Sequence, residues 1–127
     1  ISAWVAIDDA TVENACVHVI PGSHATVVPH VRSPEGMLFP EMADMEFVDA
    51  TTAVAMQLRA GEFFLFNERT VHRSEPNLSA HRRLGLAVRV TTPIVRVDSR
   101  RLFPGHNAIV VSGEDRLGFS DVAGPPD

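Results

Sequence analysis

Hydrophobic residues alternate with small or polar residues in several short stretches of the chain. In residues 1–8, Ile1, Val5 and Ile7 fall on one face of an extended strand and Trp4 falls on the other. β-Branched and aromatic residues are enriched there, as in strands generally. Further strands are predicted at residues 16–20, 52–58, 82–92 and 108–111, and the continuous apolar run at 63–66 predicts a short buried strand.

Residues 82–92 have the most regular alternation. Arg83 and Arg89 fall on one face, with Gly85 and Ala87 between them. The two small residues are predicted to leave room for a small anion beside the arginines. The other face is predicted to pack as ordinary core, and its residues are Leu84, Leu86, Val88 and Val90.

The rest of the chain favours turns over helices, because no stretch repeats hydrophobic residues at helical spacing. Residues 25–50 contain three prolines and lack a clear period, which predicts a long excursion of the kind that covers functional sites. Many short strands with Gly and Pro turns predict a mostly all-β fold. We expect an antiparallel double-stranded β-helix, or jelly roll (cupin-like), as a single domain over residues 1–127.

Composition narrows the class of protein. The 127 residues are 45% hydrophobic, enough for one core, and no apolar run reaches the length of a membrane span. The net charge is −5 and the eleven dispersed basic residues are all arginine, which disfavours nucleic acid and membrane partners and excludes lysine chemistry. A lone Cys16 and the absence of a secretory pattern predict a cytoplasmic protein, with a composition typical of GC-rich bacteria.

His72 and Arg83 are the first candidates for chemistry. His72 follows an apolar strand, and Arg83 comes eleven residues later at the start of the most regular strand. A hairpin of this length brings two such side chains into one cavity. A neutral imidazole suits Fe(II), and a guanidinium fork suits a carboxylate. Spacing alone favours a simpler interpretation, in which His72 caps a strand and Arg83 pairs with a surface carboxylate.

Three blocks of sequence carry a stronger signal through their order and spacing. They are AWVAIDD, ENAC and VIPGSH (3–9, 13–16, 19–24); LRAGE and FLF (58–62, 64–66); and VHRS, PNLS, RR and AVR (71–74, 76–79, 82–83, 87–89). In this combination the chain resembles the phytanoyl-CoA dioxygenase family of Fe(II)/2-oxoglutarate-dependent oxygenases. The resemblance covers most of residues 1–92.

The resemblance implies an enzyme that uses Fe(II), 2-oxoglutarate and molecular oxygen to oxidise a small or medium organic substrate. His72 matches an iron-binding histidine. Arg83 matches the arginine that holds the distal carboxylate of 2-oxoglutarate, Ser74 a hydroxyl that assists there, and Trp4 an aromatic residue near the cosubstrate. For the substrate we expect contacts from Arg89, Arg73 and the excursion at residues 25–50.

The chain departs from the family pattern at three points. Ala15 and Arg73 stand where the family usually has glycine. The iron site also needs a His-X-Asp or His-X-Glu element, and none of the six histidines has an acid two positions on. The family places that element just before the residue that matches Trp4, so we expect it upstream of Ile1, with this chain as the C-terminal part of the core.

The alternatives are a non-catalytic jelly-roll module, a cupin-type isomerase or metal protein with other ligands, and a related non-haem iron halogenase. The other histidines are predicted to be structural or at the surface: His24 shapes a hairpin exit, His18 is satisfied in a sheet, and His30 is at the surface. Cys16 is predicted to be an inert core thiol. The oligomeric state is left open.

Overall fold

The computed structural model describes residues 1–96 and 107–124, so His106 and the chain end at residues 125–127 lie outside the described part. The chain divides into two compact units, Ile1–Arg89 and Val90–Asp127. Each is considered by itself, and the prediction of one domain over residues 1–127 stays a prediction. In the second unit, the described residues pair through a single parallel bridge, Ala108 with Val122. The strand predicted at 108–111 is therefore wrong.

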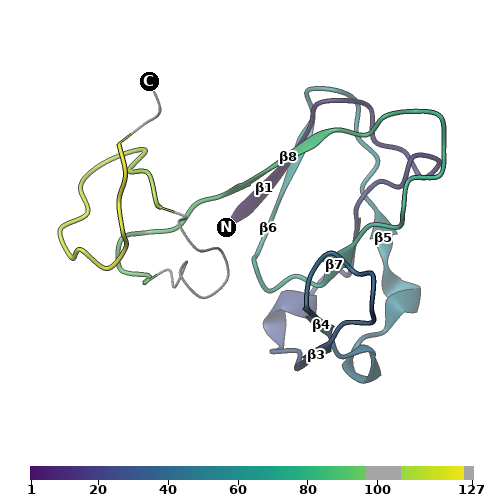
Figure 1. Cartoon of the computed structure of the whole chain (residues 1–127), viewed down its shortest axis with the longest axis horizontal. Coiled ribbons are helices and arrows are strands. Elements are labelled where there is room, and N and C mark those ends of the chain that lie inside the picture. The colour runs from purple at the N-terminus through teal and green to yellow at the C-terminus, as the bar shows by residue number, and fades with distance from the viewer. Residues whose placement is uncertain (97–106, 125–127) are drawn as a thin grey trace. The chain divides into compact units, whose positions relative to one another are not determined.

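The first sheet of the N-terminal unit has three antiparallel strands in the order β6-β1-β8. The central strand β1 (Ser2–Ala6) lies between β6 (Phe63–Phe66) and β8 (Gly85–Arg89), as Figure 1 shows. Trp4 is opposite Phe64 on one side and Ala87 on the other. This sheet is close to the sequence prediction. β6 has the predicted length, whereas β1 and β8 are shorter than predicted at both ends.

A second sheet has the order β5-β2-β7 and is also antiparallel. Its strands have two residues each: β2 (His18–Val19), β5 (Val54–Ala55) and β7 (His72–Arg73). A separate hairpin joins β3 (His30–Arg32) to β4 (Glu41–Ala43).

Helical structure in the described residues is limited to three 3-10 turns, η1 (Ser23–Ala25), η2 (Met45–Phe47) and η3 (Ala50–Thr52). The prediction of a mostly β chain without long helices is therefore confirmed. No helix in this part of the chain is long and apolar enough to cross a membrane.

Two predicted strands are too long. The ladder predicted at 16–20 begins only at His18, because the backbone turns at Ala15 and the amide of Cys16 donates to the Thr11 carbonyl at 2.8 Å. The stretch predicted at 52–58 begins inside η3 and forms only β5. In the excursion at 25–50, the hairpin β3-β4 was missed because its strands have three residues each and no buried face.

The core of the N-terminal unit is small and receives side chains from both sheets. Its fully or nearly buried members are Trp4, Ala6, Ala10, Cys16 and Val17. Partly buried Phe64, Phe66 and Val19 pack against them. The buried face of β1 therefore carries Trp4, together with Ser2 and Ala6, which the alternation places on the same face.

The opposite face of the first sheet is exposed, which corrects one prediction. Leu84, Leu86, Val88 and Val90 were expected to form core, yet each is exposed, Leu86 to 52%. Phe63 and Leu65 on the neighbouring strand β6 are also exposed. Alternation identified the two faces of the strand but not which one the rest of the described chain covers.

Ala15 has a left-handed backbone, with φ 64°, and is the one described non-glycine residue with positive φ. A residue with a Cβ loses about 1–2 kcal/mol in this region, and glycine regains most of that at an entropic cost of about 0.5–1 kcal/mol. Ala15→Gly is therefore expected to raise the free energy of unfolding by about 0.5–1 kcal/mol, measured by urea denaturation. Ala60→Gly, at an exposed turn residue of ordinary φ, should be neutral or destabilising. A loss of stability in Ala15→Gly would contradict the strain argument.

Candidate active site

Arg83 lies two residues before β8, and its guanidinium carbon is 5.7 Å from the ring centroid of Trp4. A cation over an indole face is attracted by the ring electrons. The Arg83 Nε is buried and has no hydrogen-bond partner among the described residues. Buried guanidinium donors are normally satisfied, so an unpaired one indicates that an acceptor is missing. The Arg83 guanidinium thus rests against an aromatic ring, and its Nε–H is left without an acceptor among the described residues.

Trp4 fills the space that the sequence pattern assigned to an anion. A Cβ built on Gly85 would lie 2.1 Å from Trp4 Cζ2 and 2.6 Å from Cε2. The small residue therefore makes room for the indole, and the prediction of an open space beside Gly85 is wrong. Because Trp4 is only 9% exposed, the packed ring fixes the surface on which Arg83 rests.

A row of aromatic rings leads from Trp4 to His72. Trp4 and Phe64 have ring centroids 6.1 Å apart, Phe64 and Phe66 are 5.2 Å apart, and Phe66 and His72 are 5.0 Å apart in an edge-on contact. Such spacings are typical of favourable aromatic pairs. The row connects the two candidate residues through side chains of both sheets.

The tautomer of His72 follows from one hydrogen bond. Its Nδ1 lies 2.7 Å from the carbonyl oxygen of Thr70. A carbonyl only accepts, so Nδ1 carries a proton, and in the neutral ring the lone pair is on Nε2. Histidines that bind metals commonly donate their other ring nitrogen in this way. His72 therefore fits a metal ligand, although the described residues hold no group of three His, Cys, Asp or Glu side chains able to complete a site.

The residue before His72 is also fixed. The Val71 carbonyl accepts from the Ile20 amide at 2.9 Å, and the Val71 amide donates to the Ser23 hydroxyl at 2.9 Å. Ser23 in turn donates to the Ile20 carbonyl at 2.7 Å. The PGSH motif thus holds the chain where it enters β7.

The other predicted site residues belong to β7, to β8 or to the chain directly after β7. Ser74 directly follows β7 and is exposed. Arg73 pairs in register with His18, points to the opposite side from His72, and forms an exposed ion pair with Glu75 at 3.0 Å. Arg89 ends β8 opposite Ser2, on the face that also carries Trp4. Their roles stay predictions.

Asp8 was missed by sequence reasoning. Its carboxylate accepts from Arg82 Nε and Nη2, both at 2.8 Å, and from the Leu84 amide at 2.7 Å. The hydrogen bonds from Arg82 and from the Leu84 amide lower the pKa of Asp8. Asp8 and Arg82 are 74 positions apart, so no local pattern marks the pair.

The remaining candidates have structural surroundings. Cys16 is fully buried, and burial raises the pKa of its thiol while the nearby Arg83 charge opposes this shift, as expected for a core thiol. His18 Nδ1 contacts the Cys16 carbonyl at 3.1 Å, whereas His24 and His30 are exposed.

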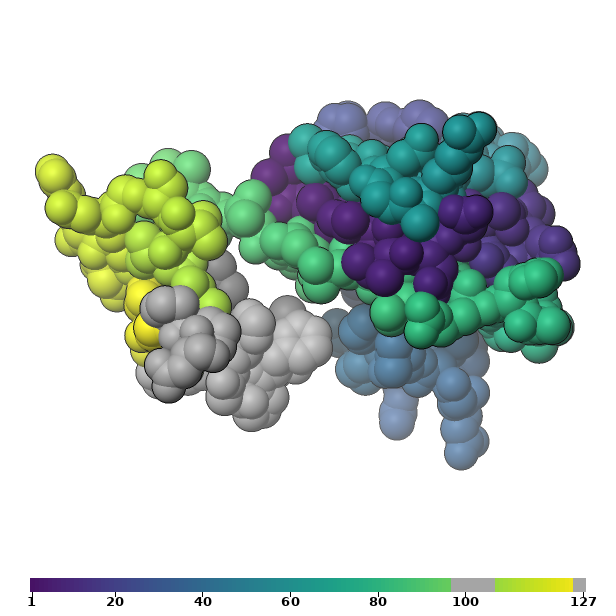
Figure 2. Space-filling view, turned by 90° about the horizontal axis from the view of Figure 1, so that it is seen from above, coloured from purple at the N-terminus to yellow at the C-terminus, as the bar shows by residue number. Residues whose placement is uncertain are grey.

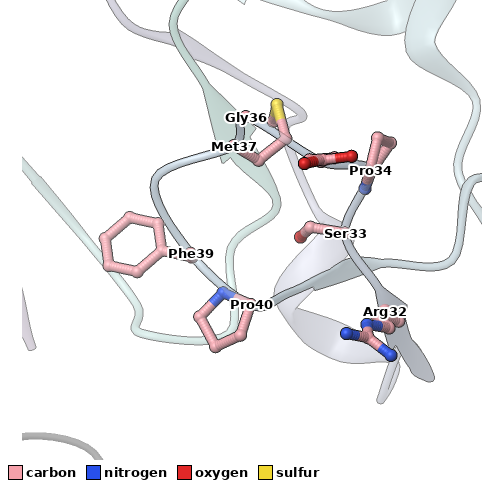
Figure 3. Close-up of a pocket in the computed structure, with 8 residues that line it drawn as sticks. Arg32, Ser33, Pro34, Gly36, Met37, Phe39 and Pro40 are labelled. Carbon is pink, nitrogen blue, oxygen red and sulfur yellow. The ribbon is translucent and has the colours of Figure 1, made fainter.

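A hollow of about 470 Å³ lies at the tip of the β3-β4 hairpin. Its lining comes from Arg32–Glu35, Gly36, Met37, Phe39 and Pro40, and Figure 3 shows these side chains around the loop. Its lining falls inside the excursion at residues 25–50 that was predicted to contact the substrate, whereas Arg83 and His72 do not line it.

Comparison with known proteins gives one family. The sequence model described as "Phytanoyl-CoA dioxygenase (PhyH)" matches residues 1–85. A "Phytanoyl-CoA dioxygenase domain-containing protein 1 homolog" of Dictyostelium discoideum is 32% identical over 85 residues, 63% of this chain. "Dioxygenase lolE1" of Epichloe uncinata is 34% identical over 83 residues, 65% of this chain. The chain spans 30% of the length of each of these two relatives.

Solved structures give the same picture. EvdO2 from Micromonospora carbonacea var. aurantiaca is 36% identical, with a TM-score of 0.54 over 68% of this chain and 35% of EvdO2. It has also been solved complexed with 2-oxoglutarate, and that structure matches equally well.

Proposed function

This chain belongs to the phytanoyl-CoA dioxygenase family, and we propose that it forms the C-terminal part of a jelly-roll oxygenase that uses Fe(II), 2-oxoglutarate and molecular oxygen. EvdO2, at 36% identity, binds the same oxoacid. The substrate in this proposal is a small or medium organic molecule that undergoes hydroxylation.

The unpaired Nε of Arg83 carries the proposal. The side chain is held against Trp4 and its buried donor has no acceptor among the described residues. A carboxylate supplies acceptors in the plane of the guanidinium fork and neutralises its charge. The distal carboxylate of 2-oxoglutarate has this chemistry, and Ser74 is the hydroxyl proposed to assist it.

His72 is the one iron ligand assigned to this chain. Its Nδ1 is committed to Thr70, which leaves Nε2 as the nitrogen that would bind Fe(II). Bound iron supplies the activation of oxygen that is coupled to conversion of 2-oxoglutarate to succinate and carbon dioxide. The protein's part is to orient the oxoacid and exclude water.

The aromatic row supports that second task. Phe64 and Phe66 lie between Trp4 and His72 and offer no hydrogen-bonding group to water. An apolar surrounding strengthens the ion pair between a guanidinium and a carboxylate. Arg89, Arg73 and the segment 25–50 are our proposed contacts for the organic substrate.

Succinate release by the natural protein that contains this chain tests the proposal. Arg83→Ala removes at least two charge-assisted hydrogen bonds, so the KM for 2-oxoglutarate should rise roughly 100-fold, while anaerobic Fe(II) binding is retained. Arg116→Ala, which removes an exposed arginine paired with Glu114, is the control and should not change the KM.

Each rival makes a different prediction. A non-catalytic module binds no iron and releases no succinate. A cupin-type metal protein binds metal with an affinity that 2-oxoglutarate does not alter. Oxoacid turnover that is unchanged in Arg83→Ala would show that the central assignment is wrong.

A further inference from the structure

The backbone beside Arg83 contains a β-bulge. The regular β1–β8 ladder ends at the pair Ala6–Gly85. Beyond it, the amides of Ile7 and Asp8 both donate to the Leu84 carbonyl, at 3.0 and 3.1 Å. Two residues of one strand facing one residue of the other is the pattern of a bulge, a device that redirects a neighbouring side chain. The side chain next to Leu84 is Arg83.

The Asp8 carboxylate fixes both chain neighbours of Arg83. Its Oδ2 accepts from the Leu84 amide at 2.7 Å and from Arg82 Nε at 2.8 Å, and its Oδ1 accepts from Arg82 Nη2 at 2.8 Å. A fork-to-carboxylate pair constrains orientation as well as distance. Arg82 is thus directed to one side of the chain, and alternation directs Arg83 to the other.

Asn14 adds further hydrogen bonds to this arrangement. Its buried side chain donates to the Asp9 carbonyl at 2.8 Å and to the Arg82 carbonyl at 3.4 Å. Its Oδ1 accepts from the Thr11 amide at 2.7 Å. One buried amide therefore links the chain that follows β1 to the residue before Arg83.

The exposure of the ion pair argues against a mainly stabilising role. The Asp8 and Arg82 side chains are 23% and 74% exposed. Exposed ion pairs contribute little to folding stability. The Asp8 carboxylate instead accepts three short hydrogen bonds from the two residues that flank Arg83. These bonds restrict where the Arg83 side chain can go.

We propose that Asp8 is a positioning residue that acts through Arg83. By accepting hydrogen bonds from Arg82 and Leu84, the two chain neighbours of Arg83, it holds the Arg83 guanidinium over Trp4. The inference rests on the proposed function of Arg83 as the oxoacid anchor. In this proposal Asp8 contacts Arg82 and Leu84 rather than the oxoacid or the metal, so its effect on oxoacid binding depends on Arg83 being present.

The test is a double-mutant cycle on the natural protein that contains this chain. The dissociation constant of 2-oxoglutarate is measured by anaerobic calorimetry with Fe(II) in four variants: unchanged, Asp8→Asn, Arg83→Ala and the double variant. Asp8→Asn keeps an acceptor for the Leu84 amide and removes the charge that holds Arg82. A shift of about 1 Å in a binding group costs up to about 100-fold, so we expect roughly 10-fold weaker binding in Asp8→Asn.

Two controls separate positioning from general damage. 2-Oxopentanoate lacks the distal carboxylate, so its dissociation constant should not change in Asp8→Asn. Glu114→Gln breaks a similar arginine–carboxylate pair, 3.0 Å between Arg116 Nε and Glu114 Oε2, and should leave 2-oxoglutarate binding unchanged. If Asp8→Asn does not fold, Arg82→Lys decides, because lysine keeps the charge without the fork.

The inference stands if Asp8→Asn weakens 2-oxoglutarate binding but has no further effect in the Arg83→Ala background. It falls if Asp8→Asn has the same effect in that background, because Asp8 would then act independently of Arg83. If Arg83→Ala weakens binding and Asp8→Asn does not, the inference about Asp8 is wrong and the proposed function of Arg83 still holds. If Arg83→Ala leaves binding unchanged, the proposed function and this inference fall together.

Discussion

Gly85→Ala is expected to displace the Trp4 ring from β8 and to lower the free energy of unfolding by about 3 kcal/mol. The added Cβ would lie 2.1, 2.6 and 2.8 Å from three atoms of the indole, closer than real contacts allow. The ring is 9% exposed and sits in the core cluster, so it has little room to move. Because Arg83 rests on this ring, oxoacid binding should weaken as well.

Urea denaturation of the variant measures the first effect and calorimetry with 2-oxoglutarate the second. Gly124→Ala is the matched control, because a Cβ at Gly124 meets nothing within 4 Å. In a Trp4→Leu background the side chain opposite Gly85 is smaller, so the cost of Gly85→Ala should shrink and the two changes should be non-additive. Full additivity would mean that the ring contact is not the cause.

His72→Ala is expected to abolish oxoacid-dependent succinate release, with a loss of at least about 100-fold, since removing even a partner of a metal ligand costs 10–100-fold. The variant removes Nε2, the ring nitrogen left for the metal because Nδ1–H donates to the Thr70 carbonyl. Folding should change little, because the ring is exposed and its contacts are the Phe66 ring and a hydrogen bond to the nearby Thr70 carbonyl.

The measurement is anaerobic Fe(II) titration of the natural protein that contains this chain, followed by turnover. His24→Gln, at another exposed histidine, should bind iron and turn over like the unchanged protein. Unaltered iron affinity in His72→Ala would remove His72 from the metal site and leave this chain without an assigned iron ligand.

Local alternation predicted the first sheet well because its strands bury one consistent face. Residues 1–8 and 63–66 were predicted as strands and contain β1 and β6. The two-residue strands of the second sheet carry too few positions to show a period. Their pairing depends on partners more than thirty residues away along the chain, such as Val54 and His72 opposite Val19, which local sequence does not encode.

The candidate site was predictable as a pair of residues but not as an arrangement. His72 and Arg83 were found through the family resemblance, and the structure adds the aromatic row that connects them. The packing of Trp4 against Gly85 was not predicted, because a small residue in the sequence indicates available space but not which side chain occupies it. Asp8 was invisible, since its partners are more than seventy residues away.

The contact between Trp4 and Arg83 also gives the protein an optical property. Trp4 is the sole tryptophan of the 127-residue sequence, so in this chain indole fluorescence originates at one place. A positive charge 5.7 Å from the ring centroid acts on the excited indole through its electric field. A dicarboxylate that neutralises this charge would alter the emission wavelength, so the buried ring serves as an intrinsic sensor of its neighbour's charge.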